Sequence, residues 1–185
     1  VTIPYKKIII PFLDELSKEA KAINAVNTIV FESCGKIIGH NTDYIGFKKA
    51  LEEKYKSNPE NALILGSGGA AEAIKYVFKK IGCDFKIVSR FPNKEQLSYD
   101  QLSEKIIRKT NIIVNASPIG TYPNIVEAPN IPYKYLNSKH LLFDLIYNPK
   151  ETEFLKRGKL YGSKTSNGLK MLKYQADKSW ELWSA

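Results

Sequence analysis

The segment ALILGSGGAAEA, residues 62–73, decides the fold because an apolar run gives way to a glycine cluster and then to apolar residues at helical spacing. This order predicts a buried strand, a tight turn and a helix. In such a turn Gly66 allows the sharp bend, Gly68 lets the backbone approach a pyrophosphate, and Gly69 with Ala70 permits close packing of the helix. The free amides at the start of the helix then face the anion. The pattern favours nucleotide binding over the alternative, a turn with only a structural role.

The same alternation of strands and helices continues after this segment. Short apolar runs at 85–89, 112–115 and 140–147 predict three more strands, and Leu102 with Ile106 marks a further helix. Continuous apolar strands that alternate with helices are typical of a parallel sheet covered on both faces, with right-handed connections. The sequence therefore predicts an α/β fold with a Rossmann-like nucleotide-binding domain.

The residues before this domain show a different pattern. At 27–41 two short extended runs flank Ser33, Cys34 and Gly35, which predicts a hairpin, and Phe47, Leu51 and Tyr55 recur at helical spacing. The polar stretch at 54–61 contains a proline and predicts a linker, with a domain boundary near residue 60.

The two ends of the chain also carry structural signals. In VTIPYKKIII, residues 1–10, the first three residues favour an extended strand, and Pro4 suits the first position of a helix. At 168–183 an apolar stripe predicts a last helix whose simplest role is packing.

The end of the second predicted strand distinguishes two cofactors. An NAD site usually places Asp or Glu about twenty residues after the glycines, where the carboxylate binds the ribose 2′-hydroxyl. Here Ser89 and Arg90 occupy that corner, and Glu95 is the first acidic residue after them. A positive charge attracts a 2′-phosphate, so the sequence favours NADP over NAD. The alternative is that Arg90 is only a solvated turn residue.

Composition restricts the class of protein. The 185 residues are 43% hydrophobic and 25% charged, and no apolar run reaches the roughly 18 to 20 residues that a membrane-spanning helix needs. The net charge is +9, but of the 28 basic residues only Arg90, Arg108 and Arg157 are arginines. Proteins that bind bases or phosphates with paired hydrogen bonds favour arginine. A solvated lysine surface therefore explains the positive net charge better than a nucleic-acid partner does. We therefore expect a soluble protein that binds neither nucleic acid nor a membrane.

The cysteines indicate the compartment. Cys34 and Cys83 are far apart and have no His or Cys partner at metal-ligand spacing. They predict reduced thiols in a cytoplasmic chain, with no metal site and no disulfide framework.

Several motifs together resemble the shikimate dehydrogenase family. They occur in the family's order and span nearly the whole chain: VTIPYK (1–6), AVNT (25–28), GHNTDYIGF (39–47), GSGGAAEA (66–73), VNASPIGT (114–121), DLIYNP (144–149) and NGLKMLKYQA (167–176). The resemblance implies the reversible, NADP-dependent reduction of 3-dehydroshikimate to shikimate in aromatic amino-acid (chorismate) biosynthesis.

The resemblance also implies the catalytic residues. Lys6 matches the family lysine that acts as general acid and base, and Asp43 matches its partner carboxylate. A nearby carboxylate favours the ammonium form and can hold it toward the substrate oxygen. The alternative for these two residues is a structural salt bridge.

Further positions follow from the same motifs. Residues matching the family's substrate site can hydrogen-bond a polyhydroxy acid, namely Thr2, Asn27, Tyr147 and Gln175. The residues that match its NADP site are Gly66, Ser67, Gly68, Gly69, Ala70, Ser89, Arg90, Asn115, Ser117, Leu145 and Gly168. No metal ligand is implied.

The family comparison predicts the domain organisation. Residues 1–60 correspond to the remainder of an α/β substrate-binding domain, 61–167 to the NADP-binding domain, and 168–185 to a helix that returns to the substrate domain. Family members begin with a further segment, so we expect this chain to be a fragment or an incomplete record of a longer one. A monomer or a homodimer is expected.

Three positions depart from the family pattern, namely Lys18, Asn24 and Thr121. They leave open a broader or different substrate preference, such as quinate. A non-catalytic nucleotide-binding homologue is a further alternative because a fold does not guarantee a function. A folate-linked dehydrogenase fits the motifs poorly.

Overall fold

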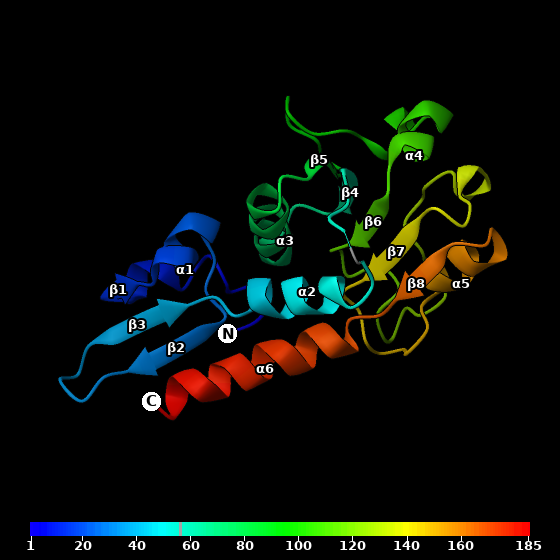
Figure 1. The fold of residues 1–185 in the computed structure, drawn as a ribbon. Helices are drawn as coiled ribbons and strands as arrows, with labels where there is room; N and C mark the ends of the chain where they lie inside the picture. Colours follow the sequence, from blue (N-terminus) through cyan, green and yellow to red (C-terminus); the bar gives the residue numbers. More distant parts are fainter. Residues whose placement is uncertain (56) are drawn as a thin grey trace.

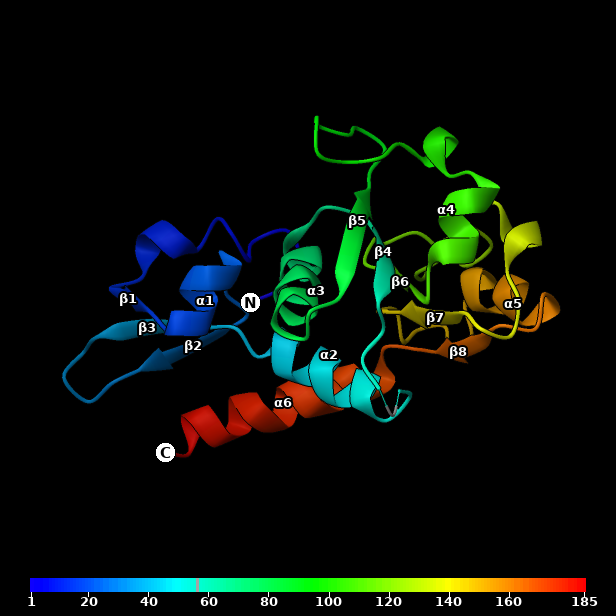
Figure 2. The ribbon, with the colours of Figure 1, turned by 45° about the horizontal axis from the view of Figure 1, so that its top comes forward.

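Two β-sheets lie at opposite ends of the molecule, and helices join them (Figure 1). This computed structural model describes residues 1–55 and 57–185. Figure 2 shows the larger sheet with helices on both of its sides and the smaller sheet beyond the third helix. None of the described helices is both long enough and apolar enough to cross a membrane.

The larger sheet has five parallel strands in the order β5-β4-β6-β7-β8, and this confirms the predicted Rossmann-like α/β fold. The strands are β4 (Asn61–Leu65), β5 (Asp84–Val88), β6 (Ile112–Asn115), β7 (Leu141–Asp144) and β8 (Lys164–Ser166). The first four lie where the apolar runs predict them. Strand β8 was not predicted, because its sequence KTS has no apolar residue and its position comes from pairing with β7.

Helices cover both faces of this sheet because successive strand residues point to opposite sides. Ile64 and Val114 pack on the face covered by α2 (Asp43–Glu52), α3 (Gly69–Lys80) and the start of α6 (Leu169–Trp183). Leu63 and Ile113 pack on the face covered by α4 (Glu104–Lys109) and α5 (Glu153–Leu160), with the 3-10 helices η2 (Tyr99–Gln101) and η3 (Tyr133–Tyr135).

The smaller sheet has the order β1-β3-β2. Its strands are β1 (Glu15–Leu16), β2 (Thr28–Phe31) and β3 (Ile37–His40), and α1 (Lys18–Ile23) precedes β2. Strands β2 and β3 form an antiparallel hairpin around Gly35, as the sequence predicts. Helix α1 ends at Asn24, whose left-handed φ of 57° stops the helix.

The prediction for the first residues is wrong. Residues 3–9 form turns and lead into the 3-10 helix η1 (Ile10–Phe12), without the expected strand or a helix that starts at Pro4. An extended segment needs a partner strand, and none of the described strands pairs with residues 1–3. The backbone is held instead by a turn from the Tyr5 amide to the Thr2 carbonyl and by the Val26 amide, which donates to the Lys6 carbonyl at 2.7 Å.

The last helix links the two sheets. Helix α6 was predicted for 168–183, and it runs alongside α2 from the larger sheet toward β2 (Figures 1 and 2). Near its end the indole nitrogen of Trp183 donates to the Ile29 carbonyl at 2.8 Å. The helix therefore brings residues from the end of the chain beside residues from its beginning.

Two smaller expectations need correction. Helix α2 ends at Glu52, so Tyr55 lies beyond it, and the Tyr55 hydroxyl donates to the Asn111 carbonyl at 2.9 Å. Helix α4 begins after the Ser103 cap, and Leu102 therefore precedes it. The predicted linker at 54–61 includes Lys56, which lies outside the described residues.

Candidate active site

Two cavities meet at the carboxyl ends of the parallel strands. The first has a volume of about 440 Å³ and the second of about 730 Å³, and Ile3, Lys6 and Ala70 line both. In open α/β sheets, ligands bind in the crevice outside the carboxyl ends of the strands. The two cavities therefore occupy the place where this fold is expected to carry its chemistry.

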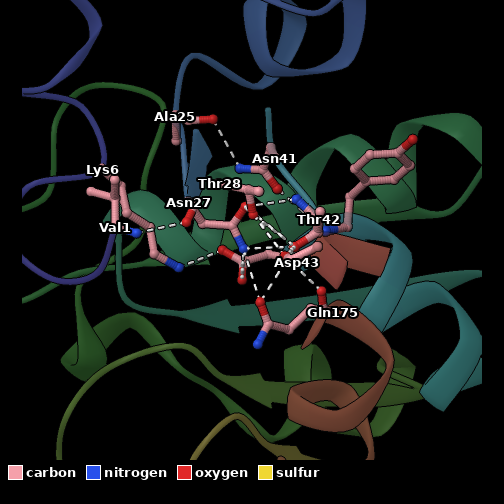
Figure 3. Close-up of polar contacts among 11 residues, drawn as sticks. Val1, Lys6, Ala25, Asn27, Thr28, Asn41, Thr42, Asp43 and Gln175 are labelled. Carbon is pink, nitrogen blue, oxygen red and sulfur yellow. Dashed lines mark hydrogen bonds and ion pairs between the residues drawn. The ribbon is translucent and has the colours of Figure 1, made fainter. Parts of the chain in front are cut away.

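Lys6 and Asp43 form an ion pair where the cavities meet. The Lys6 ammonium donates to Asp43 Oδ2 at 2.5 Å, and the two side chains are 12% and 7% exposed (Figure 3). Asp43 is the first residue of α2, where the positive end of the helix dipole favours a carboxylate. The pair is thus shielded from bulk water but keeps its lysine beside both cavities.

Asn27 connects this pair to the last helix. Its side-chain nitrogen lies 3.0 Å from Asp43 Oδ1 and 3.1 Å from Gln175 Oε1, and its oxygen accepts from the Thr42 amide at 2.7 Å. Figure 3 shows the nitrogen of Gln175 directed away from Asn27. Because the Gln175 oxygen is engaged by Asn27, its amide group is left to donate into the second cavity.

The four predicted substrate-binding residues lie together. Thr2, Asn27, Tyr147 and Gln175 all line the second cavity, with Lys6 and Asp43. They come from the N-terminal turn, the segment before β2, the loop after β7 and the middle of α6. The fold thus brings together hydroxyl and amide groups from four distant parts of the sequence, and these groups suit a polyhydroxy ligand.

A buried cluster of hydroxyl groups lies behind these residues, and the sequence analysis missed it. The Thr28 and Thr42 hydroxyls lie 2.8 and 3.0 Å from the Ser179 hydroxyl, and all three side chains are buried. Helical spacing could have revealed Ser179, because it follows Gln175 by four residues and donates to its carbonyl. The position of Thr42, next to Asp43, was a second available signal.

The glycine turn forms one wall of the first cavity. Gly66 has φ +111°, and a Cβ there would lie 3.1 Å from the backbone of Ala116 and Ser117. In front of Gly68 there is open space, and no side chain caps the first amides of α3. These amides are therefore free to bind an anion, and the residues present fit the pyrophosphate of a dinucleotide.

Most of the predicted cofactor residues line this first cavity. They are Gly66, Ser67, Gly68, Gly69, Ala70, Ser89, Arg90 and Ser117. Its described lining includes Lys6, Lys7 and Arg90 but no carboxylate, and this suits a phosphate-bearing ligand. Phe91 and Tyr99, which the motifs do not predict, also line the cavity.

Three predicted cofactor residues lie elsewhere. Leu145 and Gly168 line the second cavity, and Asn115 lines neither cavity because it is completely buried. The Asn115 side-chain oxygen accepts from the Ser117 hydroxyl at 2.6 Å. Asn115 therefore reaches the first cavity only indirectly, through Ser117 and through the carbonyl of Ile119.

Asp144 is a second buried carboxylate close to the site. Burial raises its pKa to about 6, and hydrogen bonds from Thr152, the Ile146 amide and Asn115 partly oppose this shift. Within the described chain no Lys, Arg or His forms an ion pair with it. Its negative charge is thus held by neutral donors alone.

This raised pKa predicts a pH-dependent loss of stability. The folded pKa of about 6 lies above the ordinary value of 3.8, so Asp144 stabilises the fold most below pH 3.8 and this contribution is lost as the pH rises through 6. The loss corresponds to about 3 kcal/mol. The side chain in Asp144→Asn does not titrate. We therefore expect the free energy of unfolding of Asp144→Asn, relative to that of the wild type, to increase by about this amount as the pH rises from 4 to 7.

Urea unfolding of both proteins at pH 4, 5, 6 and 7 measures the effect, because subtraction removes the contribution of all other titrating groups. Parallel stability curves for the two proteins would contradict the prediction.

The described residues show no group of three or more His, Cys, Asp or Glu side chains placed to hold a metal ion.

Several known proteins are similar to this chain, and they have the same activity in their names. Residues 1–29 match the family model of the shikimate dehydrogenase substrate binding domain. The shikimate dehydrogenase (NADP(+)) of Methanococcus maripaludis is 42% identical over 100% of this chain and 71% of its own length.

Solved structures agree with this similarity. A chorismate mutase/shikimate 5-dehydrogenase fusion protein from Clostridium acetobutylicum superposes with a TM-score of 0.88 at 40% identity, over 99% of this chain and 69% of that chain. A shikimate 5-dehydrogenase from Thermus thermophilus, in complex with NADP(H) and shikimate, gives a TM-score of 0.85 at 30% identity, over 99% and 71%. The chain spans about 70% of the length of these relatives.

Proposed function

Because the chain belongs to the shikimate dehydrogenase family, we propose that its two cavities bind NADP and shikimate for the reversible oxidation of shikimate to 3-dehydroshikimate. The observation that carries this assignment is the Lys6–Asp43 pair at the junction of the two cavities. It places a proton-carrying group where a cofactor and a substrate can meet.

The first cavity is assigned to NADP. Its glycine turn presents the amides at the start of α3 to the pyrophosphate, and Arg90 lies at the corner where a 2′-phosphate needs a positive charge. When bound, NADP supplies or accepts the hydride.

The protein's part in the reaction is proton transfer and orientation. During reduction Lys6 Nζ gives a proton to the substrate's carbonyl oxygen as that oxygen becomes a hydroxyl, and during oxidation it accepts the proton back. Asp43 holds the ammonium group and stabilises its positive charge, and Asn27 holds the other carboxylate oxygen. The low exposure of both side chains strengthens these interactions.

Substrate orientation is assigned to groups that line the second cavity. The Gln175 amide can donate to a ring hydroxyl, and the hydroxyls of Thr2 and Tyr147 can both donate and accept. We propose that residues 1–60 and α6 form the substrate-binding part, and that residues 61–167 form the NADP-binding part. The protein's location is proposed to be the cytoplasm, where Cys34 and Cys83, both free thiols, stay reduced.

The test is NADP reduction by the chain with shikimate, with parallel assays that contain NAD or quinate. We expect turnover that prefers shikimate to quinate and NADP to NAD. Turnover of quinate alone would change the substrate assignment, and no turnover of either acid with either nucleotide would contradict the proposed function.

The cofactor assignment predicts a selective effect of Arg90→Ala. Losing a charged hydrogen-bond donor to the 2′-phosphate should raise KM for NADP roughly tenfold. KM for NAD, which lacks that phosphate, should change by less than about twofold.

Arg108→Ala is the matched control, because Arg108 is an exposed arginine paired with Glu104 on α4. Equal increases in KM for both nucleotides in Arg90→Ala would show that Arg90 does not read the 2′-phosphate.

A further inference from the structure

The contacts of Asp144 extend into the walls of both cavities. Asp144 is the last residue of β7 and pairs in register with Asn115, the last residue of β6. Both side chains are completely buried. Two polar side chains therefore meet at the carboxyl edge of the sheet, directly below the candidate active site.

One set of contacts leads to the cofactor cavity. Asp144 Oδ1 accepts from the Asn115 amide nitrogen at 3.1 Å. The same nitrogen lies 3.2 Å from the Ile119 carbonyl, and the Asn115 oxygen accepts from the amide and the hydroxyl of Ser117. Residues 116–119 line the first cavity. The carboxylate thus fixes the Asn115 amide, which in turn holds this loop at two points.

A second set of contacts leads to the substrate cavity. Asp144 Oδ1 also accepts from the Ile146 amide at 3.0 Å. Ile146 lies between Leu145 and Tyr147, and both of these line the second cavity. The bond fixes the start of the loop that carries Tyr147.

The remaining oxygen has a third partner. Asp144 Oδ2 accepts from the Thr152 hydroxyl at 2.6 Å, and Thr152 caps α5. The carboxylate therefore receives three donors, none of them charged. A buried carboxylate without a cation is costly, and an apolar side chain at this position would avoid that cost. The contacts of Asp144 to the loops of both cavities explain why this position has a carboxylate and not an apolar side chain.

We propose that Asp144 is a positioning residue that holds the loop 116–119 of the cofactor cavity and the loop 145–147 of the substrate cavity in one fixed arrangement. It acts through Asn115 on one side and through the Ile146 amide on the other. This role rests on the proposed function, since it concerns how the two ligands of that reaction are placed. It also gives Asn115 an indirect role in place of direct contact with the cofactor.

Three variants separate positioning from general stability. Asp144→Ala removes every acceptor, whereas Asp144→Asn keeps an amide oxygen that can accept from both Asn115 and Ile146. Thr152→Val removes the third donor and the side-chain cap of α5, and it keeps both loop contacts of Asp144. The matched control is Thr110→Val, because Thr110 is a buried threonine that donates to the Ile106 carbonyl just before β6, at the opposite end of the sheet.

Activity is the first measurement. Asp144→Ala should raise KM for NADP and KM for shikimate by roughly tenfold each. The loop 145–147 loses its hydrogen bond to the carboxylate, and Asn115, which holds the loop 116–119, loses its own hydrogen bond to the same group. Asp144→Asn, Thr152→Val and Thr110→Val should each stay within about threefold of the wild type for both ligands. An increase in only one KM for Asp144→Ala, or equal increases in Asp144→Ala and Thr110→Val, would overturn the proposal.

The second measurement does not depend on turnover. Amide hydrogen exchange of the ligand-free protein, followed residue by residue, should speed up roughly tenfold at both Ile146 and Ser117 in Asp144→Ala. Ser117 does not touch Asp144, so its change reports transmission through Asn115. If Ile146 alone changes, the two loops are not held together and the proposal fails.

The exchange experiment also keeps the two claims distinct. If the wild type turns over neither acid, the proposed function fails, but joint deprotection of Ile146 and Ser117 still shows that Asp144 joins the two loops. If the wild type is active and Asp144→Ala changes neither KM nor the exchange at Ser117, only the positioning role fails. Should Asp144→Ala not fold, Asn115→Ala tests the same path, with the expectation that Ser117 loses protection and Ile146 keeps it.

Discussion

Replacing Lys6 with alanine is expected to lower kcat about 10³-fold, the middle of the range for losing a general acid and base. The reason is that we propose Lys6 as the group that transfers the proton, and Asp43 holds it at 2.5 Å where the two cavities meet. The interaction lost belongs mainly to the transition state, so the affinity for NADP should change by less than about threefold. Steady-state kinetics with shikimate, together with a fluorescence titration of NADPH, measures both quantities.

The control for this variant is Lys48→Ala, which removes an exposed lysine that pairs with Glu52 on α2. Its kcat should stay within about twofold of the wild type. A Lys6→Ala variant with the turnover of the wild type would remove Lys6 from the mechanism, and the pair with Asp43 would then be a structural salt bridge.

Gly168→Ala is expected to have the largest effect on stability. A Cβ at Gly168 would lie 2.0 Å from the Leu145 carbonyl oxygen and 2.5 Å from its carbonyl carbon. Both atoms belong to the backbone, and the Gly168 amide donates to the neighbouring Ile146 carbonyl at 3.0 Å. The clash can therefore be relieved only by moving the start of α6 away from the loop after β7. We expect a loss of about 3 kcal/mol, at the upper end of the usual range for overpacking.

The same movement should affect the substrate site, because Leu145 and Gly168 both line the second cavity. KM for shikimate should rise at least about tenfold in the folded fraction. Urea unfolding measures the stability, with Gly68→Ala as its control, because Gly68 has φ −79° and open space around it. A free energy of unfolding within about 1 kcal/mol of the wild type for Gly168→Ala would show that the loop moves at little cost.

The parallel sheet was predictable because its three central strands, β4, β6 and β7, are buried on both faces. Ile64 on one face and Ile113 and Leu142 on the other are completely buried, so these segments appear in the sequence as continuous apolar runs. Helix α5 left a signal that was not used, since Thr152 before Glu153 is a good N-terminal cap. Strand β8 left none, because its residues are polar and its pairing with β7 involves only backbone groups.

The candidate site was predictable in part. Motif resemblance identified Lys6, Asp43 and Gln175, and the structure brings all three to one cavity. Sequence spacing marks Ser179 and Thr42 singly, but it does not predict that they form a cluster with Thr28, because hydrogen bonds between residues far apart in the chain leave no periodic pattern. The burial of Asn115 was also not predicted, since it follows from the pairing of β6 with β7 beside Asp144, and the sequence alone does not show this register.

The path of α6 has a consequence for how the protein is made. The bond between Asn27 and Gln175 joins residues 148 positions apart, and the wall that Gln175 adds to the second cavity comes from the last element of the chain. A nascent chain that has reached Ser166 already contains every described strand of both sheets, but it has no residue from the wall that α6 adds to the second cavity. Because contacts between distant residues form late, we expect the second cavity to be completed only after α6 has been translated. A ribosome that stops before α6 would therefore release a chain whose second cavity lacks this wall.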